Sequence, residues 1–345
     1  MPSRGVFPRN SYTSAAAFNT NPASLMTANL QNRSFGKTGE QITALGLGGG
    51  WLDRSSYAEG VATVRRALEL GVTYFDTSPM YCRGVSQMIL GDALEGRSEK
   101  HLLATKLGYF ADPGHFRSIP ALHAQLEDNL RRLRRTQVDV LQVHEADWAC
   151  WWNDEIPPGQ PLKPDRSYNF ANAPVVQVLR EAKANGRCRF IGITGNNAEI
   201  MGHVLSQVDV DAILVAFNYS LLFRGARRFV LPLACRKETA FIAGAAFQGG
   251  RLSEVHPDWI TSPPSWVTAE IQVRLHRLYD LQASCGLTLV NLAIRYLLAD
   301  PSISTILIGA ATPAQLEESV AAAQQGCLPP DLHQAIEKLG LPPGF

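Results

Sequence analysis

Short apolar runs alternate with amphipathic segments along most of the chain after residue 35. Residues 57–70, for example, carry their apolar side chains on one face of a helix, and Gly71 provides a C-terminal cap. The apolar runs are short and do not alternate strictly with polar residues, which is typical of parallel strands buried on both faces. The pattern predicts strands at residues 42–48, 72–76, 101–106, 138–143, 189–193, 211–216, 239–244 and 303–308, and helices at residues 57–70, 85–95, 118–134, 174–185, 197–207, 225–237, 286–299 and 313–325.

Eight strand-then-helix cycles within roughly 300 residues predict a closed α/β barrel, the (β/α)8 fold of the TIM type. The alternative, a doubly wound open sheet, would need a Gly-x-Gly-x-x-Gly turn between an early strand and a helix. Residues 46–50 read Gly-Leu-Gly-Gly-Gly and do not supply that motif directly before a helix, so the barrel is favoured. An N-terminal hairpin is expected at residues 35–42.

Two long loops interrupt the alternation. Residues 145–173, rich in Trp and Pro, follow the fourth strand, and residues 249–285 follow the seventh and include an extra helical segment near 265–284. Both follow carboxyl ends of strands, where the active sites of barrels lie, so we expect both loops to serve function. We expect one barrel domain over residues 32–345. Residues 1–31 lack acidic residues and the apolar stretch of a secretory signal, and are expected to form a flexible tail; the alternative, a transit peptide, shares this composition but would need an amphipathic helix.

Charge and composition exclude several classes of protein. The formal net charge is +1 at pH 7, which gives no electrostatic reason to expect nucleic acid or a membrane surface as a partner. The longest apolar runs, such as residues 212–217, are too short to span a bilayer. The six cysteines have neither metal-ligand nor disulfide spacing, so we expect no metal site and a cytoplasmic location.

Three predicted strands lead into an ionisable side chain. Asp76 ends the second strand, Lys106 ends the third, and His144 follows the fourth. Neighbouring strands of a (β/α)8 barrel end at one edge of its mouth, and Tyr81 comes just after Asp76. A charge at the end of a buried strand is costly unless it is paired. We therefore predict that Asp76, Tyr81, Lys106 and His144 form one catalytic site.

These four residue types suit proton transfer to or from a carbonyl oxygen. Asp76 is the counter-ion expected for Lys106, and the lysine is expected to lower the pKa of Tyr81 towards the range of a general acid. His144 is expected to hydrogen-bond the carbonyl oxygen and orient it. For any one of these residues alone, a structural ion pair or a core histidine is the better explanation. All four in this order favour catalysis.

The sequence resembles the aldo-keto reductases over residues 32–328, nearly the whole chain after the tail. Asp76-Thr77-Ser78-Pro79-Met80-Tyr81 matches the family's catalytic aspartate–tyrosine segment, Ala104-Thr105-Lys106 its lysine strand, and Leu141-Gln142-Val143-His144 its histidine strand. Residues 190–195, 218–224, 250–252 and 308–319 are similar to segments of its cofactor site. Within the family, the chain is most similar to the sugar dehydrogenase branch of L-galactose and aldose dehydrogenases.

The resemblance implies a nicotinamide dinucleotide, NAD or NADP, bound at the loops after strands 7 and 8 and at the start of the last barrel helix. The residues that it assigns to this cofactor are Gly49, Thr194, Gly195, Asn196, Tyr219, Phe247, Gly250, Leu252, Gly309, Ala311, Gln315, Glu318 and Ser319. The basic residue that commonly meets the 2′-phosphate of NADP corresponds to Ala311 here, which slightly favours NAD. Arg251 is the residue best able to reverse this preference.

Aromatic side chains are expected near the substrate, namely Trp51, Tyr109, Trp148 and Trp151. Their rings suit a sugar or an aromatic aldehyde, and packing of the long loop on the barrel rim explains them equally well. The resemblance implies an NAD(P)-dependent oxidoreductase that transfers hydride between nicotinamide and a carbonyl or alcohol carbon of a small molecule. The alternatives are a non-catalytic dinucleotide-binding regulatory subunit and a barrel lyase or isomerase without nicotinamide. Monomer and homo-oligomer are both left open.

Overall fold

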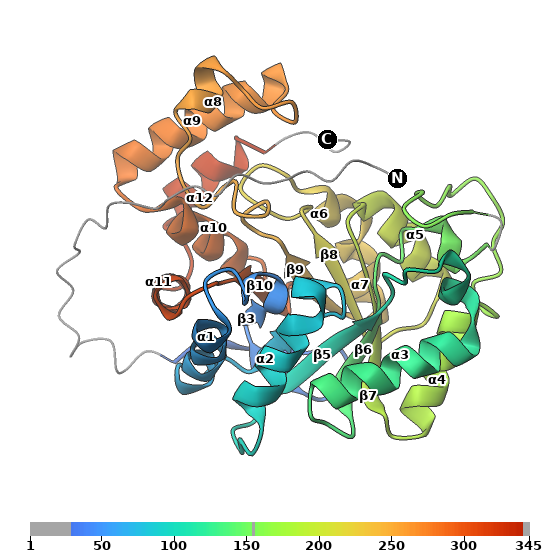
Figure 1. The fold of residues 1–345 in the computed structure, drawn as a ribbon. Helices are drawn as coiled ribbons and strands as arrows, with labels where there is room; N and C mark the ends of the chain where they lie inside the picture. The colour runs from blue at the N-terminus through green and yellow to red at the C-terminus, as the bar shows by residue number, and fades with distance from the viewer. Residues whose placement is uncertain (1–28, 154–155, 341–345) are drawn as a thin grey trace.

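A computed structural model describes residues 29–153 and 156–340. Its centre is a closed barrel of eight parallel strands in the order β10-β3-β4-β5-β6-β7-β8-β9 (Figure 1). This topology confirms the predicted (β/α)8 fold. The strands are β3 (Leu45–Gly48), β4 (Tyr74–Asp76), β5 (Leu102–Leu107), β6 (Val138–Val143), β7 (Cys188–Gly195), β8 (Ala212–Ala216), β9 (Ala240–Gly244) and β10 (Thr305–Gly309).

Helices surround the barrel (Figure 1). They are α1 (Tyr57–Glu69), α2 (Val85–Leu94), α3 (Ile119–Arg132), α4 (Pro174–Ala184), α5 (Ala198–Gln207), α6 (Gly225–Phe229), α7 (Leu231–Lys237), α10 (Leu289–Leu298), α11 (Pro313–Gln324) and α12 (Pro330–Glu337). The prediction of one helix at residues 225–237 is wrong, because α6 ends at Phe229 and Pro232 in the first turn of α7 cannot donate a hydrogen bond to the turn before it. Helix α12 was not among the predicted helices.

The hairpin lies against the amino-terminal ends of the barrel strands. Its strands β1 (Asn32–Ser34) and β2 (Gln41–Thr43) pair antiparallel. Phe35 and Ile42 are fully buried in the same apolar cluster as Tyr74 and Leu102, at the starts of β4 and β5. The predicted hairpin is therefore present. Its two strands lie on either side of residues 35–40, which form the turn. The strand predicted at residues 42–48 is divided at Ala44 into β2 and β3.

The direction of each side chain along the strands determines what reaches the mouth of the barrel. In β5, Leu102 and Ala104 belong to the apolar cluster inside the barrel, whereas Leu103 and Leu107 belong to the cluster beneath the helices. Because side chains alternate between the two faces of a strand, Lys106 follows Ala104 to the inside. The same alternation carries Asp76 inward after Tyr74, the inward residue of β4.

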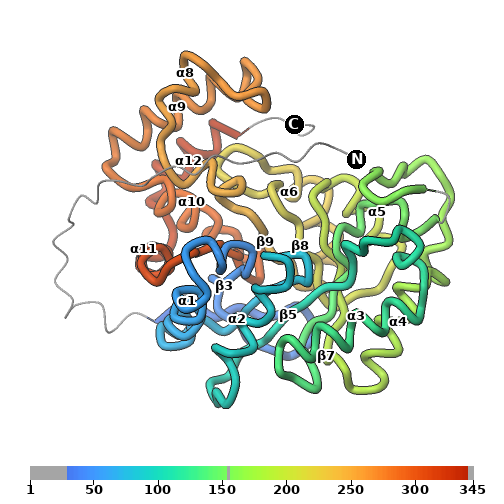
Figure 2. The backbone as a smooth tube through the Cα atoms, viewed as in Figure 1, coloured from blue at the N-terminus to red at the C-terminus, as the bar shows by residue number. Residues whose placement is uncertain are grey.

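The segment after β9 forms two helices that project from one side of the barrel, α8 (Asp258–Thr261) and α9 (Ala269–Cys285) (Figures 1 and 2). The Arg274 guanidinium on α9 donates to the Leu339 carbonyl beyond α12 at 3.2 Å. Helix α9 confirms the extra helical segment predicted near residues 265–284. Within the described residues no single helix is long and apolar enough to cross a membrane; α9 and α10 pass that test only together, with a bend of 97° between them.

The predicted tail falls almost wholly on residues 1–28, which lie outside the described residues. The division of the chain into a tail and one barrel domain therefore stays a prediction.

Candidate active site

A buried ion pair forms the base of the candidate site. The Lys106 ammonium group donates to Asp76 Oδ1 and to the Thr77 carbonyl, the latter at 2.9 Å. Gln142 donates from its side-chain amide to the other Asp76 oxygen at 2.8 Å. Burial lowers the pKa of Lys106, and Asp76 opposes that effect. Because both Asp76 oxygens have donors, the charges of this pair are compensated without water.

Tyr81 stands above the ion pair on a short turn, Tyr81–Gly84, that follows β4. The turn is tight, since Cys82 and Arg83 both have left-handed backbone, at φ 53° and 54°. The Lys106 ammonium lies 4.6 Å from the centroid of the Tyr81 ring. No hydrogen bond to the Tyr81 hydroxyl is present among the described residues, and the side chain is half-buried, so this hydroxyl is available to a substrate.

The prediction that Lys106 lowers the pKa of Tyr81 is wrong for this arrangement. Desolvation, the negative charge of Asp76 and that of Glu145 hold the pKa of Tyr81 well above its ordinary value. Lys106 faces the ring of Tyr81, and both of its described hydrogen bonds go to Asp76 and Thr77. Tyr81 is therefore protonated at neutral pH.

His144 lies beside Tyr81, with the two ring planes at 87° and their centroids 5.6 Å apart. Burial, followed by the charge of Lys106, lowers the pKa of His144 well below its usual range, so the imidazole is neutral. Its Nδ1 is 2.9 Å from Ser78 Oγ, which itself accepts from the backbone N–H of Met80. In the described network Nδ1 is the acceptor available to the buried Ser78 hydroxyl. Donation from Ser78 leaves the imidazole proton on Nε2, as an oxygen-binding donor requires.

The structure brings Tyr109 and Trp148 to the site. The Tyr109 ring lies 4.6 Å from the His144 ring, and the Trp148 ring lies 5.1 Å from that of Tyr109. Trp51 packs at the other side of the mouth, where a Cβ on Gly309 would meet its ring at 2.4 Å. Trp151 does not line the site: it is fully buried, and its indole N–H donates to the His144 carbonyl at 2.9 Å. The prediction that Trp151 contacts the substrate is therefore wrong. Its indole instead holds the backbone of His144.

Three residues of the site were missed by the sequence analysis. Ser78 hydrogen-bonds the imidazole, and its place in the Asp-Thr-Ser-Pro turn could have indicated this role. Gln142 hydrogen-bonds Asp76, and the inward register of β6 could have indicated that its side chain points into the barrel. Glu145 accepts a hydrogen bond from the Tyr109 hydroxyl at 3.0 Å. In the sequence, the only indication of this role is that Glu145 directly follows His144.

The predicted cofactor residues fall into two groups. Those whose position is open to a ligand lie at the ends of β7, β9 and β10: Asn196, Phe247, Gly250, Gly309, Ala311 and Gln315. Thr194 and Gly195 end β7 and are buried, with the Thr194 hydroxyl donating to the Val143 carbonyl at 3.1 Å. Gly49 is also buried, and a Cβ there would lie 2.3 Å from Ser86 Oγ.

Other predicted cofactor side chains are engaged within the protein. Tyr219 is buried, and its hydroxyl donates to Asp300 at 2.5 Å. Leu252 and Ser319 are buried too, and Glu318 accepts from the Thr288 hydroxyl at 3.1 Å. The side chains of Tyr219, Leu252 and Ser319 would have to move to contact a cofactor directly, whereas Glu318 is exposed. Phe217 at the end of β8, with left-handed backbone and 37% exposed, is an open aromatic ring that the sequence analysis missed.

The segment around α11 fits a phosphate-bearing ligand. Thr312 caps the helix by accepting from the Gln315 backbone N–H at 3.3 Å, and Pro313 occupies its first turn. Gly309 and Gly250 are exposed, and a Cβ on Gly250 would meet nothing within 4 Å. Exposed glycine backbone just before a helix N-terminus, as at Gly309, suits the pyrophosphate of a dinucleotide. In the described part of the chain no cluster of His, Cys, Asp or Glu could hold a metal ion.

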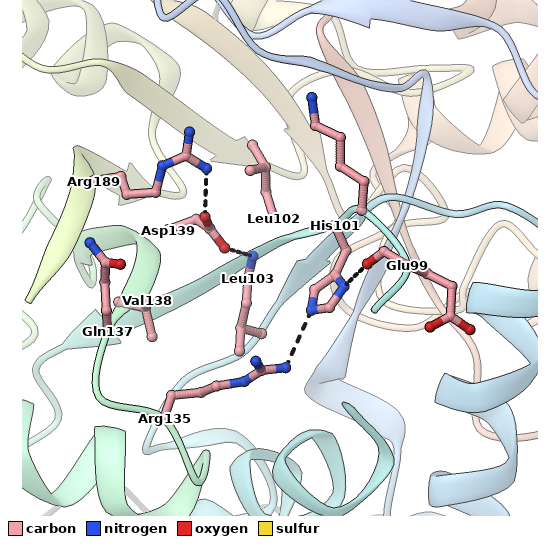
Figure 3. A pocket seen from close by; sticks show the side chains of 10 residues that line it. Glu99, His101, Leu102, Leu103, Arg135, Gln137, Val138, Asp139 and Arg189 are labelled. Atoms are coloured by element: carbon pink, nitrogen blue, oxygen red, sulfur yellow. Dashed lines mark hydrogen bonds and ion pairs between the residues drawn. The ribbon is translucent and has the colours of Figure 1, made fainter. Parts of the chain in front are cut away.

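A pocket of about 290 Å³ lies at the opposite end of the barrel, at the amino-terminal ends of β5, β6 and β7 (Figure 3). Its charged side chains are engaged within the protein. Asp139 accepts from Arg189 at 2.9 Å and from the backbone N–H of Leu103 at 2.8 Å. The pocket is therefore separate from Lys106 and His144, which stand at the carboxyl ends of the strands.

A (β/α)8 barrel with a protonated tyrosine, a neutral histidine and a buried lysine–aspartate pair at its mouth has the arrangement on which the resemblance to the aldo-keto reductases rests. The chain belongs to the aldo/keto reductase family, whose sequence profile matches residues 44–340. This membership confirms the resemblance on which the sequence analysis relied.

Several characterised proteins are similar to the chain. It is 29% identical to L-galactose dehydrogenase of Arabidopsis thaliana over 308 residues, which cover 86% of this chain and 89% of that protein. It is 27% identical to pyridoxal 4-dehydrogenase of Microbacterium luteolum, covering 90% of this chain and 98% of that protein. It is 24% identical to D-threo-aldose 1-dehydrogenase of a Pseudomonas species, covering 81% and 89%. The solved structure of aldo-keto reductase AKR11C1 from Bacillus halodurans, holo form, shares the fold with a TM-score of 0.70 at 23% identity, covering 90% of this chain and 96% of that one.

Proposed function

We propose that the protein is an NAD(P)-dependent oxidoreductase acting on the carbonyl or alcohol carbon of a sugar or small aldehyde. One observation carries this proposal: the Tyr81 hydroxyl has no hydrogen-bond partner among the described residues, and the Tyr81 ring adjoins a neutral imidazole whose Nδ1 is engaged with Ser78. Two proton donors side by side at the mouth of a barrel suit a carbonyl oxygen.

In this proposal each residue has a defined task. The bound nicotinamide supplies or accepts the hydride. Tyr81 gives its proton to the carbonyl oxygen in reduction or takes it back in oxidation. His144 donates from Nε2 to the same oxygen and orients it. Lys106 and Asp76 hold a compensated charge pair beneath the tyrosine, so that proton transfer occurs beside fixed charges.

Sugars and small aldehydes are proposed as substrates because two similar proteins carry sugar dehydrogenase names and a third is a pyridoxal dehydrogenase. Tyr109 and Trp148 offer adjoining aromatic faces beside His144, which suit either a sugar ring or an aromatic aldehyde. We propose NAD as the preferred cofactor, since Ala311 cannot pair with a 2′-phosphate. A higher kcat/KM with NADP than with NAD would reject that preference. We also propose a cytoplasmic location.

The test is turnover of aldoses, pyridoxal-like aldehydes and aliphatic aldehydes in both directions with both cofactors, for the wild type and Tyr81→Phe. We expect Tyr81→Phe to lower kcat by about a hundredfold or more while NADH binding, followed by fluorescence, is unchanged. Full activity in Tyr81→Phe would refute the role of the tyrosine. A wild type that binds NADH but turns over no substrate would favour the regulatory subunit instead.

A further inference from the structure

The carboxyl group of Glu145 lies inside the candidate site, yet the proton transfer described above does not use it. Glu145 directly follows His144, and only 6% of its surface is exposed. Its Oε1 accepts from the Tyr109 hydroxyl at 3.0 Å, and its Oε2 accepts from the Asn196 side-chain amide at 2.5 Å. Glu145 therefore joins the loop after β5 to the loop after β7, across the end of β6.

The backbone at both ends of the first hydrogen bond is strained. Glu145 has φ 57° and Tyr109 has φ 58°, in the left-handed region that residues with a side chain rarely adopt. Such conformations persist only where the surrounding structure holds them, and they cluster at functional sites. Here the Trp148 N–H donates to the Glu145 carbonyl at 2.9 Å, and the Ala146 N–H donates to the Thr194 carbonyl at 2.6 Å.

Glu145 is also the neighbour of the imidazole atom that would bind substrate. His144 Nε2 lies 4.0 Å from Glu145 Oε1, and the Tyr109 ring that Glu145 holds packs against the imidazole. Because Ser78 occupies Nδ1, the proton on Nε2 faces either the substrate oxygen or the Glu145 carboxyl group.

Groups of both signs face Glu145. The titratable ones are Tyr81, Lys106, Tyr109, His144 and Asp147. Burial, and next the charge of Asp147, raise the pKa of Glu145 to about 7, against the opposing effects of Tyr109, Asn196 and Lys106. Asp147 Oδ1 is buried without a hydrogen-bond partner in the described part of the chain.

We propose that Glu145 is a positioning residue of the reaction, which holds Tyr109 and Asn196 on either side of His144 and, by gaining a proton, removes a negative charge that faces His144 Nε2. This inference rests on the proposed function. When Glu145 is ionised, its charge attracts the Nε2 proton and raises the pKa of Tyr81 further. Both effects weaken proton donation to a carbonyl group. When Glu145 is neutral, both donors are free to face the substrate.

The pH dependence of carbonyl reduction by the full chain tests this role. We expect kcat/KM to fall by about tenfold as the pH rises through the pKa of Glu145, the effect of a new charge near the reacting donors. Glu145→Gln removes this fall. Tyr109→Phe removes a hydrogen bond that lowers the pKa of Glu145, so it moves the fall to higher pH. Glu181→Gln, on outer helix α4, keeps the wild-type profile. A fall near neutral pH that persists in Glu145→Gln overturns the inference.

A second measurement separates this inference from the proposed function. Carbon-13 NMR of the labelled glutamate carboxyl groups, with the chain free of cofactor, follows Glu145 directly. We expect its resonance, identified by its loss in Glu145→Gln or by its shift in Tyr109→Phe, to titrate near pH 7 and not near 4.5. Titration near 4.5 overturns the inference whether or not turnover is found. Titration near 7 without turnover of any substrate supports the positioning contacts and counts against the proposed function alone.

Discussion

The Glu145 carboxyl group also predicts how stability depends on pH. Burial and the charge of Asp147 raise its pKa from 4.5 to about 7 in the folded protein. At about 1.4 kcal/mol for each pKa unit, this raises the cost of burying the ionised form by about 3 kcal/mol relative to the neutral form. The folded state binds the proton more tightly than the unfolded state. The stability that Glu145 gains from its proton is therefore fully present below the pKa of this group in the unfolded chain, and it is lost as the pH rises through 7.

Glu145→Gln removes this titration and keeps the size of the side chain. Relative to the wild type, we expect the variant to gain about 2.5 kcal/mol in free energy of unfolding between pH 5 and pH 8. The absolute difference at any one pH also reflects how an amide fits between Tyr109 and Asn196. The change with pH in the stability difference between the variant and the wild type reports the titration of the Glu145 carboxyl group alone.

Urea unfolding followed by tryptophan fluorescence, at pH values from 5 to 8, measures this change. Glu99→Gln is the matched control, because the Glu99 carboxylate pairs with Arg97, which stays charged throughout, and the pKa of Glu99 is lowered below 4.5, outside this range. Its difference from the wild type should stay constant. An equal difference between Glu145→Gln and the wild type at pH 5 and pH 8 would refute the reasoning that Glu145 holds a proton in the folded protein.

Two further changes test the rest of the site. Lys106→Met leaves Asp76 buried without its cation and should lower the free energy of urea unfolding at pH 8 by about 3–5 kcal/mol. Much of this loss should be recovered in Lys106→Met/Asp76→Asn. A Lys106→Met variant as stable as the wild type would contradict the buried pair. Ser78→Ala removes the donor to His144 Nδ1 and should lower kcat/KM for carbonyl reduction by about tenfold, with a loss of about 1 kcal/mol in stability. Unchanged kcat/KM in Ser78→Ala would show that Ser78 does not set the imidazole proton.

The barrel and the cluster of four catalytic candidates could be predicted because both depend on local periodicity. Each strand is a short apolar run, and alternation along it carries a residue such as Lys106 inside at the carboxyl end. Neighbouring strands then bring Asp76, Lys106 and His144 together without any knowledge of the loops. The split of residues 42–48 at Ala44 was missed because a hairpin strand and a barrel strand are both apolar there.

The loops carry no periodicity, and their side-chain directions depend on distant partners. Trp148 and Trp151 lie three residues apart in one loop, but only Trp151 is fully buried, because its indole reaches the His144 carbonyl and its own carbonyl accepts from Arg117. Tyr219 turns inward to Asp300, 81 residues away in sequence. Glu145 is held by residues from two other loops. No sequence window contains these contacts.

The directions of the pKa shifts connect the site to its chemistry. In the free protein Tyr81 is protonated and His144 is neutral, because burial and neighbouring charges move their pKa values away from neutral pH in opposite directions. This is the protonation state that donates to a carbonyl oxygen. Oxidation of an alcohol would need Tyr81 to lose its proton first, against the upward shift of its pKa. The free protein is therefore arranged for proton donation, and Glu145 is the group of the site whose pKa of about 7 allows it to adjust that donation at neutral pH.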